Sequence, residues 1–162
     1  MVSMNSCRKQ AIRLSMLAML CLPAIWPQSS TDRVTVGQPQ TIAGKRNAAV
    51  QTKIPVSILE GFHVNSNAPK DEFLIPLKVT WTSLGALEAP QVVFPKPETI
   101  DVAGNPTLVF TGKIDLIASF KISAKAPAGP GIAAGKLLYQ ACNNKACFKP
   151  ANIEFNIPYQ VQ

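Results

Sequence analysis

Apolar and polar residues alternate with a period of two along much of the chain after residue 50, and the spacing typical of helices is hard to find. Three segments show the alternation most clearly, 73–81, 113–123 and 153–159. Since successive side chains of a strand point to opposite faces, each is predicted to be a strand with one buried face. The apolar faces consist of Phe73, Ile75, Leu77, Val79 and Trp81, then Ile114, Leu116, Ala118, Phe120 and Ile122, then Ile153, Phe155, Ile157 and Tyr159.

Four shorter apolar segments, 53–59, 91–95, 107–110 and 135–142, bring the predicted total to seven or eight strands. Turn residues separate the segments, and most of the 14 prolines follow residue 30, which disfavours long helices. Strands with one apolar face bury it by stacking two sheets. The sequence therefore predicts an all-β fold, an immunoglobulin-like sandwich of antiparallel strands, with a β-barrel as the alternative.

The N-terminus has the layout of a secretory signal. Arg8, Lys9 and Arg13 precede the apolar run 14–26, after which the chain turns polar. A membrane-spanning helix takes about 20 apolar residues, and this run is shorter. A cleaved signal peptide over residues 1–30 is therefore predicted, and with it an exported, periplasmic protein.

The chain after the signal is predicted to hold a single domain. Residues 31–49 are polar and punctuated by Gly and Pro, which predicts a flexible leader, and the domain is expected to span residues 50–162. Lipoprotein anchoring through Cys21 is disfavoured, because Leu20 stands where lipid-attachment motifs have a small residue.

Charge and composition exclude several functional classes. After residue 30, 13 Lys and Arg against 9 Asp and Glu leave a net charge of +4. We interpret these charges as residues that keep the protein soluble. The sequence contains no run of Lys and Arg interleaved with aromatic residues, so a nucleic-acid-binding surface is not predicted. No Ser/His/Asp set and no glycine-rich phosphate loop can be argued, so hydrolase and nucleotide-binding functions are not predicted.

Cleavage of the signal removes Cys7 and Cys21 and leaves Cys142 and Cys147 as the only cysteines. In an oxidising compartment, an even number at close spacing predicts a disulfide. The four residues between them, NNKA, have the Asn pair that tight turns favour, so a hairpin is expected. Directly opposed residues of such a hairpin lie about 4.5 Å apart at Cα in non-hydrogen-bonded positions, near the lower limit for a disulfide.

The small loop favours a working redox pair over a structural staple. Closing about six residues stabilises a fold by about 2 kcal/mol, against about 4.7 kcal/mol for a loop of about 100 residues. Short, surface disulfides are also more easily reduced. Lys145 and Lys149 flank the pair and are candidates to stabilise a thiolate. A passive structural clamp, with both lysines on a solvated turn, is the alternative.

A metal site would compete for the same residues. Zinc takes three or four ligands, so Cys142, Cys147 and His63, the one histidine, would need a carboxylate as well. No metal site is predicted on this basis. His63 is interpreted instead as a surface or half-buried strand residue.

Three segments of the chain, ILEGFHVNSNAP (58–69), FLIPLKVTW (73–81) and LLYQACNNKACFKP (137–150), resemble the N-terminal periplasmic domain of the thiol:disulfide interchange protein DsbD. The resemblance runs from about Val50 to Tyr159, and the third segment is the most specific. It implies an immunoglobulin-like fold and a pair of cysteines that passes electrons between a DsbD-type membrane protein and thioredoxin-fold proteins.

By the same resemblance, Cys147 meets the partner's cysteine and Cys142 resolves the mixed disulfide. This exchange needs no cofactor, and we expect a monomer. Phe62, Tyr139 and Phe148 are candidates for an apolar collar that controls access to the pair, with core packing as the alternative for each.

Two departures from the family qualify this hypothesis. No membrane domain or thioredoxin-like domain follows in the sequence, so a stand-alone carrier, part of a split system or a repurposed domain is expected. Where the family has an acidic and aromatic cap over its cysteines, residues 99–110 provide Asp101 but no aromatic residue before Phe110. An exported β-sandwich binding module, with the disulfide as a turn clamp only, is the competing function.

Overall fold

The computed structural model describes residues 33–102 and 104–162. The predicted signal peptide and Cys21 lie outside these residues. Twelve strands and no helix are found in the described part, so none of it forms a helix able to cross a membrane. The strand number exceeds the predicted seven or eight because several strands have only two or three residues.

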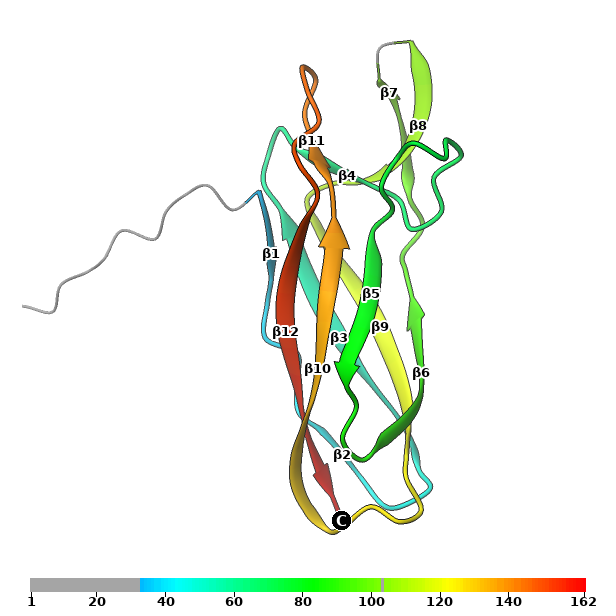
Figure 1. The fold of residues 1–162 in the computed structure, drawn as a ribbon, viewed down its shortest axis with the longest axis vertical. Helices are drawn as coiled ribbons and strands as arrows, with labels where there is room; N and C mark the ends of the chain where they lie inside the picture. Colours follow the sequence, from blue (N-terminus) through cyan, green and yellow to red (C-terminus); the bar gives the residue numbers. More distant parts are fainter. Residues whose placement is uncertain (1–32, 103) are drawn as a thin grey trace, which may run out of the picture. The chain divides into compact units, whose positions relative to one another are not determined.

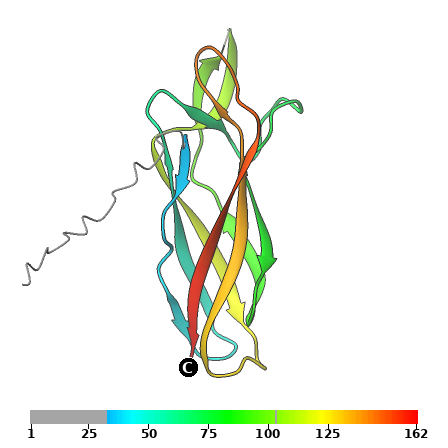
Figure 2. The same cartoon turned by 60° about the vertical axis from the view of Figure 1, so that its left-hand side comes forward.

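Two four-stranded sheets face each other and form a sandwich (Figure 1). The first has the order β1 (Val34–Val36), β3 (Ala49–Ile58), β9 (Lys113–Ile122) and β6 (Leu87–Val93). The second has the order β2 (Ile42–Gly44), β12 (Ala151–Val161), β10 (Gly129–Tyr139) and β5 (Lys78–Ser83). Neighbouring strands are antiparallel except β2 and β12, which are parallel. Figure 2 shows the same sheets after a turn of the view, with β12 and β10 in front.

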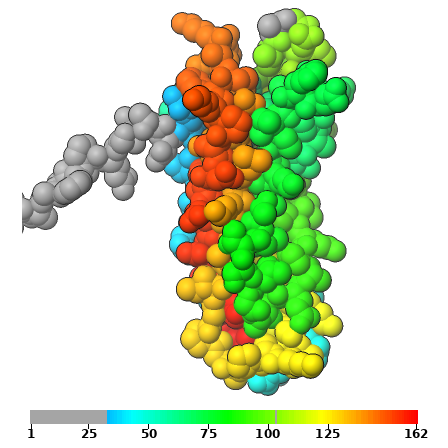
Figure 3. Space-filling model, viewed as in Figure 1, coloured from blue at the N-terminus to red at the C-terminus, as the bar shows by residue number. Residues whose placement is uncertain are grey.

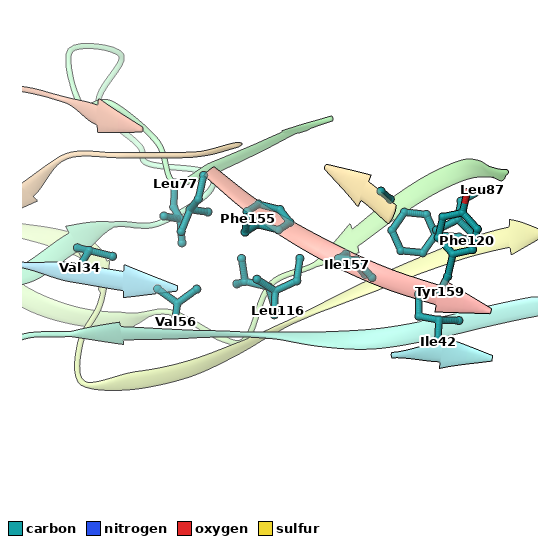
Figure 4. Close-up of a cluster of buried hydrophobic side chains, with 14 of the residues drawn as sticks. Val34, Ile42, Val56, Leu77, Leu87, Leu116, Phe120, Phe155, Ile157 and Tyr159 are labelled. Carbon is teal, nitrogen blue, oxygen red and sulfur yellow. The ribbon is translucent and has the colours of Figure 1, made fainter. Parts of the chain in front are cut away.

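The core lies between these sheets and is built from the predicted alternating faces (Figure 4). Leu116 and Phe120 of β9 and Phe155 and Ile157 of β12 are buried, which confirms the predicted inward faces of both strands. Trp81 of β5 packs edge-on against Phe120 and Phe155, with ring centroids 5.0 and 5.8 Å apart. Such edge-to-face pairs add to the stabilisation from apolar burial.

A third sheet, at one end of the sandwich, carries the cysteines (Figure 1). Its order is β11 (Ala141–Cys142), β4 (His63–Asn65), β8 (Asn105–Phe110) and β7 (Glu98–Val102). β11 follows β10 after one residue, so the long ribbon of β10 and β12 leads directly into the cysteine hairpin.

Two expectations about secondary structure are wrong. The predicted strand over 73–81 begins only at Lys78, and Phe73 is 84% exposed. Pro76, which has no N–H group to donate to a ladder, lies in the part that is not a strand. The segment expected to be a flexible leader contains β1 and β2, in which Val34 and Ile42 are buried in the core.

Candidate redox site

Cys142 and Cys147 form a disulfide across a hairpin, as the sequence predicts. Their Cα atoms are 4.0 Å apart. Backbone hydrogen bonds lie on both sides of the pair, from Asn143 N to Ala146 O and from Phe148 N to Ala141 O, each 2.9 Å long. The cysteines therefore occupy the non-hydrogen-bonded position between two hydrogen-bonded pairs, where opposed side chains approach most closely.

The side chain of Asn143 shapes the turn. Its Oδ1 accepts hydrogen bonds from the backbone N–H groups of Lys145 and Ala146, each at 2.9 Å. An asparagine that bonds the backbone two residues ahead stabilises a tight turn. The turn thus has a local cause, and it holds Cys147 opposite Cys142.

The two sulfur-bearing residues differ in their access to solvent. Cys142 is 1% exposed, whereas Cys147 is an exposed residue. Cys147 lines a cleft of about 350 Å³. Figure 3 shows this cleft as a notch between the cysteine hairpin, in orange, and the end of the β7–β8 hairpin, in yellow-green.

The β7–β8 hairpin forms the wall opposite the cysteines. Asp101 and Val102 line the cleft from this side. The Oδ1 atom of Asp101 accepts a hydrogen bond of 2.8 Å from Gly104 N, so this carboxylate also closes its own turn. Phe110, by contrast, is buried at 1% exposure. Among the described residues that line the cleft, none is Phe, Tyr or Trp.

The three aromatic candidates for a collar separate into two groups. Phe62 and Phe148 lie together, with ring centroids 5.8 Å apart. Tyr139 is half-buried and packs against the core. Arg33 joins the first group: its guanidinium carbon lies 3.7 Å from the Phe148 ring centroid and 5.6 Å from that of Phe62. No local pattern in the sequence points to Arg33, because the contact joins residues far apart in the chain.

The two lysines are both exposed but differ in position. Lys145 lines the cleft beside Cys147, whereas Lys149 is not among its lining residues. The geometry thus makes Lys145 the better placed cation for a thiolate at Cys147.

Gln140 and Asn65 support both legs of the hairpin, and sequence reasoning missed them. Gln140 Nε2 donates a hydrogen bond of 3.1 Å to Phe148 O, which ties the residue after Cys147 to the end of β10. Asn65 Nδ2 donates to Ile75 O at 3.0 Å and to Gln140 Oε1 at 3.5 Å. Asn65 is 1% exposed, so these contacts satisfy a buried amide.

His63 lies next to the disulfide. It pairs directly with Cys142 in the antiparallel ladder of β4 and β11 and lines the same cleft as Cys147. It is only 5% exposed, rather than a surface or half-buried residue as expected, and this burial lowers its pKa below the ordinary 6.5. Within residues 33–102 and 104–162, no three His, Cys, Asp or Glu residues cluster around a possible metal position.

Residues 33–158 match the family described as thiol:disulfide interchange protein DsbD, N-terminal. The chain belongs to this DsbD N-terminal family. The match begins at Arg33, so it includes β1 and β2 as well as the cysteine hairpin. Membership establishes the immunoglobulin-like sandwich and places the chain in a family of thiol:disulfide exchange proteins.

Two solved structures are similar to this chain. The N-terminal periplasmic domain of ScsB from Proteus mirabilis has a TM-score of 0.61 and 19% identity, over 82% of this chain and 49% of that one. This chain therefore spans about half the length of that structure. The DsbD N-terminal domain of Neisseria meningitidis, in its reduced form, has a TM-score of 0.42 and 20% identity, over 78% of this chain and 90% of that one. No curated protein matches the sequence.

Proposed function

We propose that this domain carries out thiol:disulfide exchange through Cys142 and Cys147 in the periplasm. In this proposal it passes electrons between a DsbD-type membrane protein and thioredoxin-fold proteins. The observation that carries the proposal is the unequal access of the two cysteines: Cys147 lines an open cleft, whereas Cys142 is 1% exposed. A sulfur that meets a partner needs access, whereas a resolving sulfur needs only to reach its neighbour.

The proposed exchange proceeds through a mixed disulfide and needs no cofactor. A thiolate of the reduced donor attacks the Cys147 sulfur, the bond between Cys142 and Cys147 breaks, and Cys142 leaves with the electron pair. The donor's second thiolate then attacks the donor sulfur that is bonded to Cys147, and Cys147 is released as a thiolate. Two electrons and two protons leave the donor, which becomes a disulfide, and the domain becomes a dithiol. The reverse sequence passes the electrons to an oxidised acceptor.

The surroundings of Cys147 fit this role. Lys145 lines the cleft and brings a positive charge to the side where a Cys147 thiolate would form. Phe148 directly follows Cys147, and its ring packs against that of Phe62, with the Arg33 guanidinium over both. No Phe, Tyr or Trp is among the described residues that line the cleft, so a partner can reach Cys147 without displacing a cap built from such residues.

Trapping the mixed disulfide tests the assignment of the two sulfurs. In Cys142→Ala, the resolving sulfur is missing, so Cys147 should accumulate mixed disulfides with thioredoxin-fold proteins under non-reducing conditions. Cys147→Ala is the matched control and should trap far less, because Cys142 is buried. Equal trapping by both variants would contradict the proposed roles. Trapping only by Cys147→Ala, in which Cys142 is the remaining cysteine, would also contradict them.

The reduction potential distinguishes exchange from a passive clamp. Disulfides with a purely structural role typically have potentials below about −300 mV. A redox carrier should instead equilibrate with thioredoxin-fold proteins near their own potentials. A value well below this limit, with no reduction by such a protein, would favour the alternative of an exported binding module.

A further inference from the structure

Because Cys142 is buried, its thiol proton has little access to a water molecule that could accept it. When a reduced domain passes electrons on, Cys142 has to become a thiolate before it can attack the mixed disulfide at Cys147. At 1% exposure, the Cys142 side chain is almost closed to water. Burial in a poorly solvated site also disfavours the charged form of a thiol. A proton acceptor within the protein would remove this obstacle.

His63 is placed to be this acceptor. It lies directly opposite Cys142 in the β4–β11 ladder, and opposed residues of antiparallel strands project to the same face with Cβ atoms about 4.5–5.5 Å apart. Cys142 is in turn paired with Cys147, so the three side chains share one face of the sheet. Independently, His63 lines the cleft that Cys147 opens into.

We propose that His63 accepts the proton of the Cys142 thiol during resolution and returns it when Cys142 leaves in the reverse direction. This inference rests on the proposed thiol:disulfide exchange. The proton moves from the Cys142 sulfur to an imidazole nitrogen, and the thiolate attacks the Cys147 sulfur. The bond between Cys147 and the partner sulfur breaks. The partner leaves with the electron pair and then takes the proton from the imidazolium or from water.

The protonation state of His63 suits this role. Burial lowers its pKa, so the imidazole is neutral near neutral pH and has a nitrogen free of a proton. The charged groups around it are Asp101 and Lys145 in the cleft, and Glu60 and Lys113 in the adjoining cavity of about 520 Å³, which His63 also lines. Asp101 already accepts the hydrogen bond from Gly104, and it is the competing candidate for the proton.

A two-step reaction with the disulfide reagent 5,5′-dithiobis(2-nitrobenzoate) separates the two cysteines. Attack by Cys147 of the reduced protein releases one coloured thiolate, and attack by Cys142 on the mixed disulfide releases a second. Both releases can be followed by stopped-flow absorbance. In the wild-type protein we expect two releases, the second falling in rate as acid protonates His63.

In His63→Gln the first release should be nearly unchanged and the second should slow by about a hundredfold, the lower range for loss of a general base. In His63→Ala, added imidazole should enter the opened space and restore part of the second rate. Glu60→Gln is the matched control, because Glu60 lines only the adjoining cavity, and it should leave both releases unchanged. Circular dichroism confirms that each variant is folded.

Each other outcome has a defined meaning. Equal second rates in His63→Gln and wild type would overturn the role of His63 and leave the exchange function standing. Slowing without rescue by imidazole would also overturn it, since it would indicate a structural effect. A second release that slows in Asp101→Asn but not in His63→Gln would show that Asp101 accepts the proton. A wild-type protein that gives no second release at any pH would instead contradict the proposed exchange itself.

Discussion

The guanidinium carbon of Arg33 lies 3.7 Å from the centroid of the Phe148 ring. Phe148 is the residue that directly follows the exposed Cys147. The contact joins the residue before β1 to the second leg of the cysteine hairpin. A cation over an aromatic face stabilises a fold by about 0.5–1 kcal/mol when exposed and by about 2 kcal/mol when desolvated. Arg33 is half-buried, and its Nε has no hydrogen-bond partner among the described residues.

A double-mutant cycle should detect this contact. Arg33→Ala and Phe148→Leu should each lower the free energy of unfolding. The loss in the double variant should be about 1 kcal/mol smaller than the sum of the two single losses, because both substitutions remove the same interaction. Urea denaturation of the oxidised protein measures all four forms. Arg33→Lys, which keeps the charge without the planar group, is the control. Additive effects would show that Arg33 and Phe148 do not interact energetically.

Removal of the disulfide should leave the domain folded. Its loop spans only the residues from Cys142 to Cys147, so the chain-entropy model gives a stabilisation of about 2 kcal/mol. The double variant Cys142→Ala/Cys147→Ala should unfold at lower urea concentration by about that free energy and keep its circular dichroism spectrum. Unfolding of the reduced protein in buffer would contradict a carrier that has to cycle between both forms.

The stability of the domain should fall on acidification through His63. Burial lowers its pKa in the folded state, so as the pH falls through 6.5 the unfolded chain takes up a proton that the folded chain does not. The free energy of unfolding should therefore decrease from about pH 7.5 to about pH 5, the range in which histidine titrates. His63→Gln should lose less over this interval, because carboxylates contribute to both proteins alike. Parallel losses in the two proteins would refute this role of His63.

Tyr159 should stabilise the end of the sandwich opposite the cysteines. Its hydroxyl oxygen accepts a hydrogen bond of 2.8 Å from Ala86 N, and its ring lies so close to Gly131 that no side chain fits there. Tyr159→Phe leaves the Ala86 N–H group without this acceptor and should cost about 1–2 kcal/mol of unfolding free energy. Ile132→Val, at a residue 60% exposed, should change little. An unchanged urea midpoint in Tyr159→Phe would show that water replaces the bond.

The long strands could be predicted from sequence because their burial alternates. In β9 and β12, every second residue faces the core, and a period of two is visible without knowledge of the partner strand. The cysteine hairpin was predictable for a similar reason: the turn residue Asn143 and both cysteines lie within six positions. In each case the signal is local.

The remaining features depend on contacts that are distant in sequence. β1 and β2 contribute few buried residues, and their pairing with β3 and β12 gives no periodic pattern. In 73–81 the alternation was present, but the strand begins only after Pro76. The pairing of His63 with Cys142 and the stacking of Arg33 on Phe148 each join segments more than 70 residues apart.

The ribbon of β10 and β12 determines where the cysteine hairpin lies relative to the core. Its register is unbroken from the pair Gly129 and Val161 to the pair Tyr139 and Ala151, just short of the cysteine hairpin. A slip by one residue would turn every buried side chain of a strand toward solvent, so the ribbon cannot yield in small steps. The hairpin that carries Cys147 is therefore joined to the core by a ribbon of fixed register, which gives this cysteine a defined position relative to the sandwich.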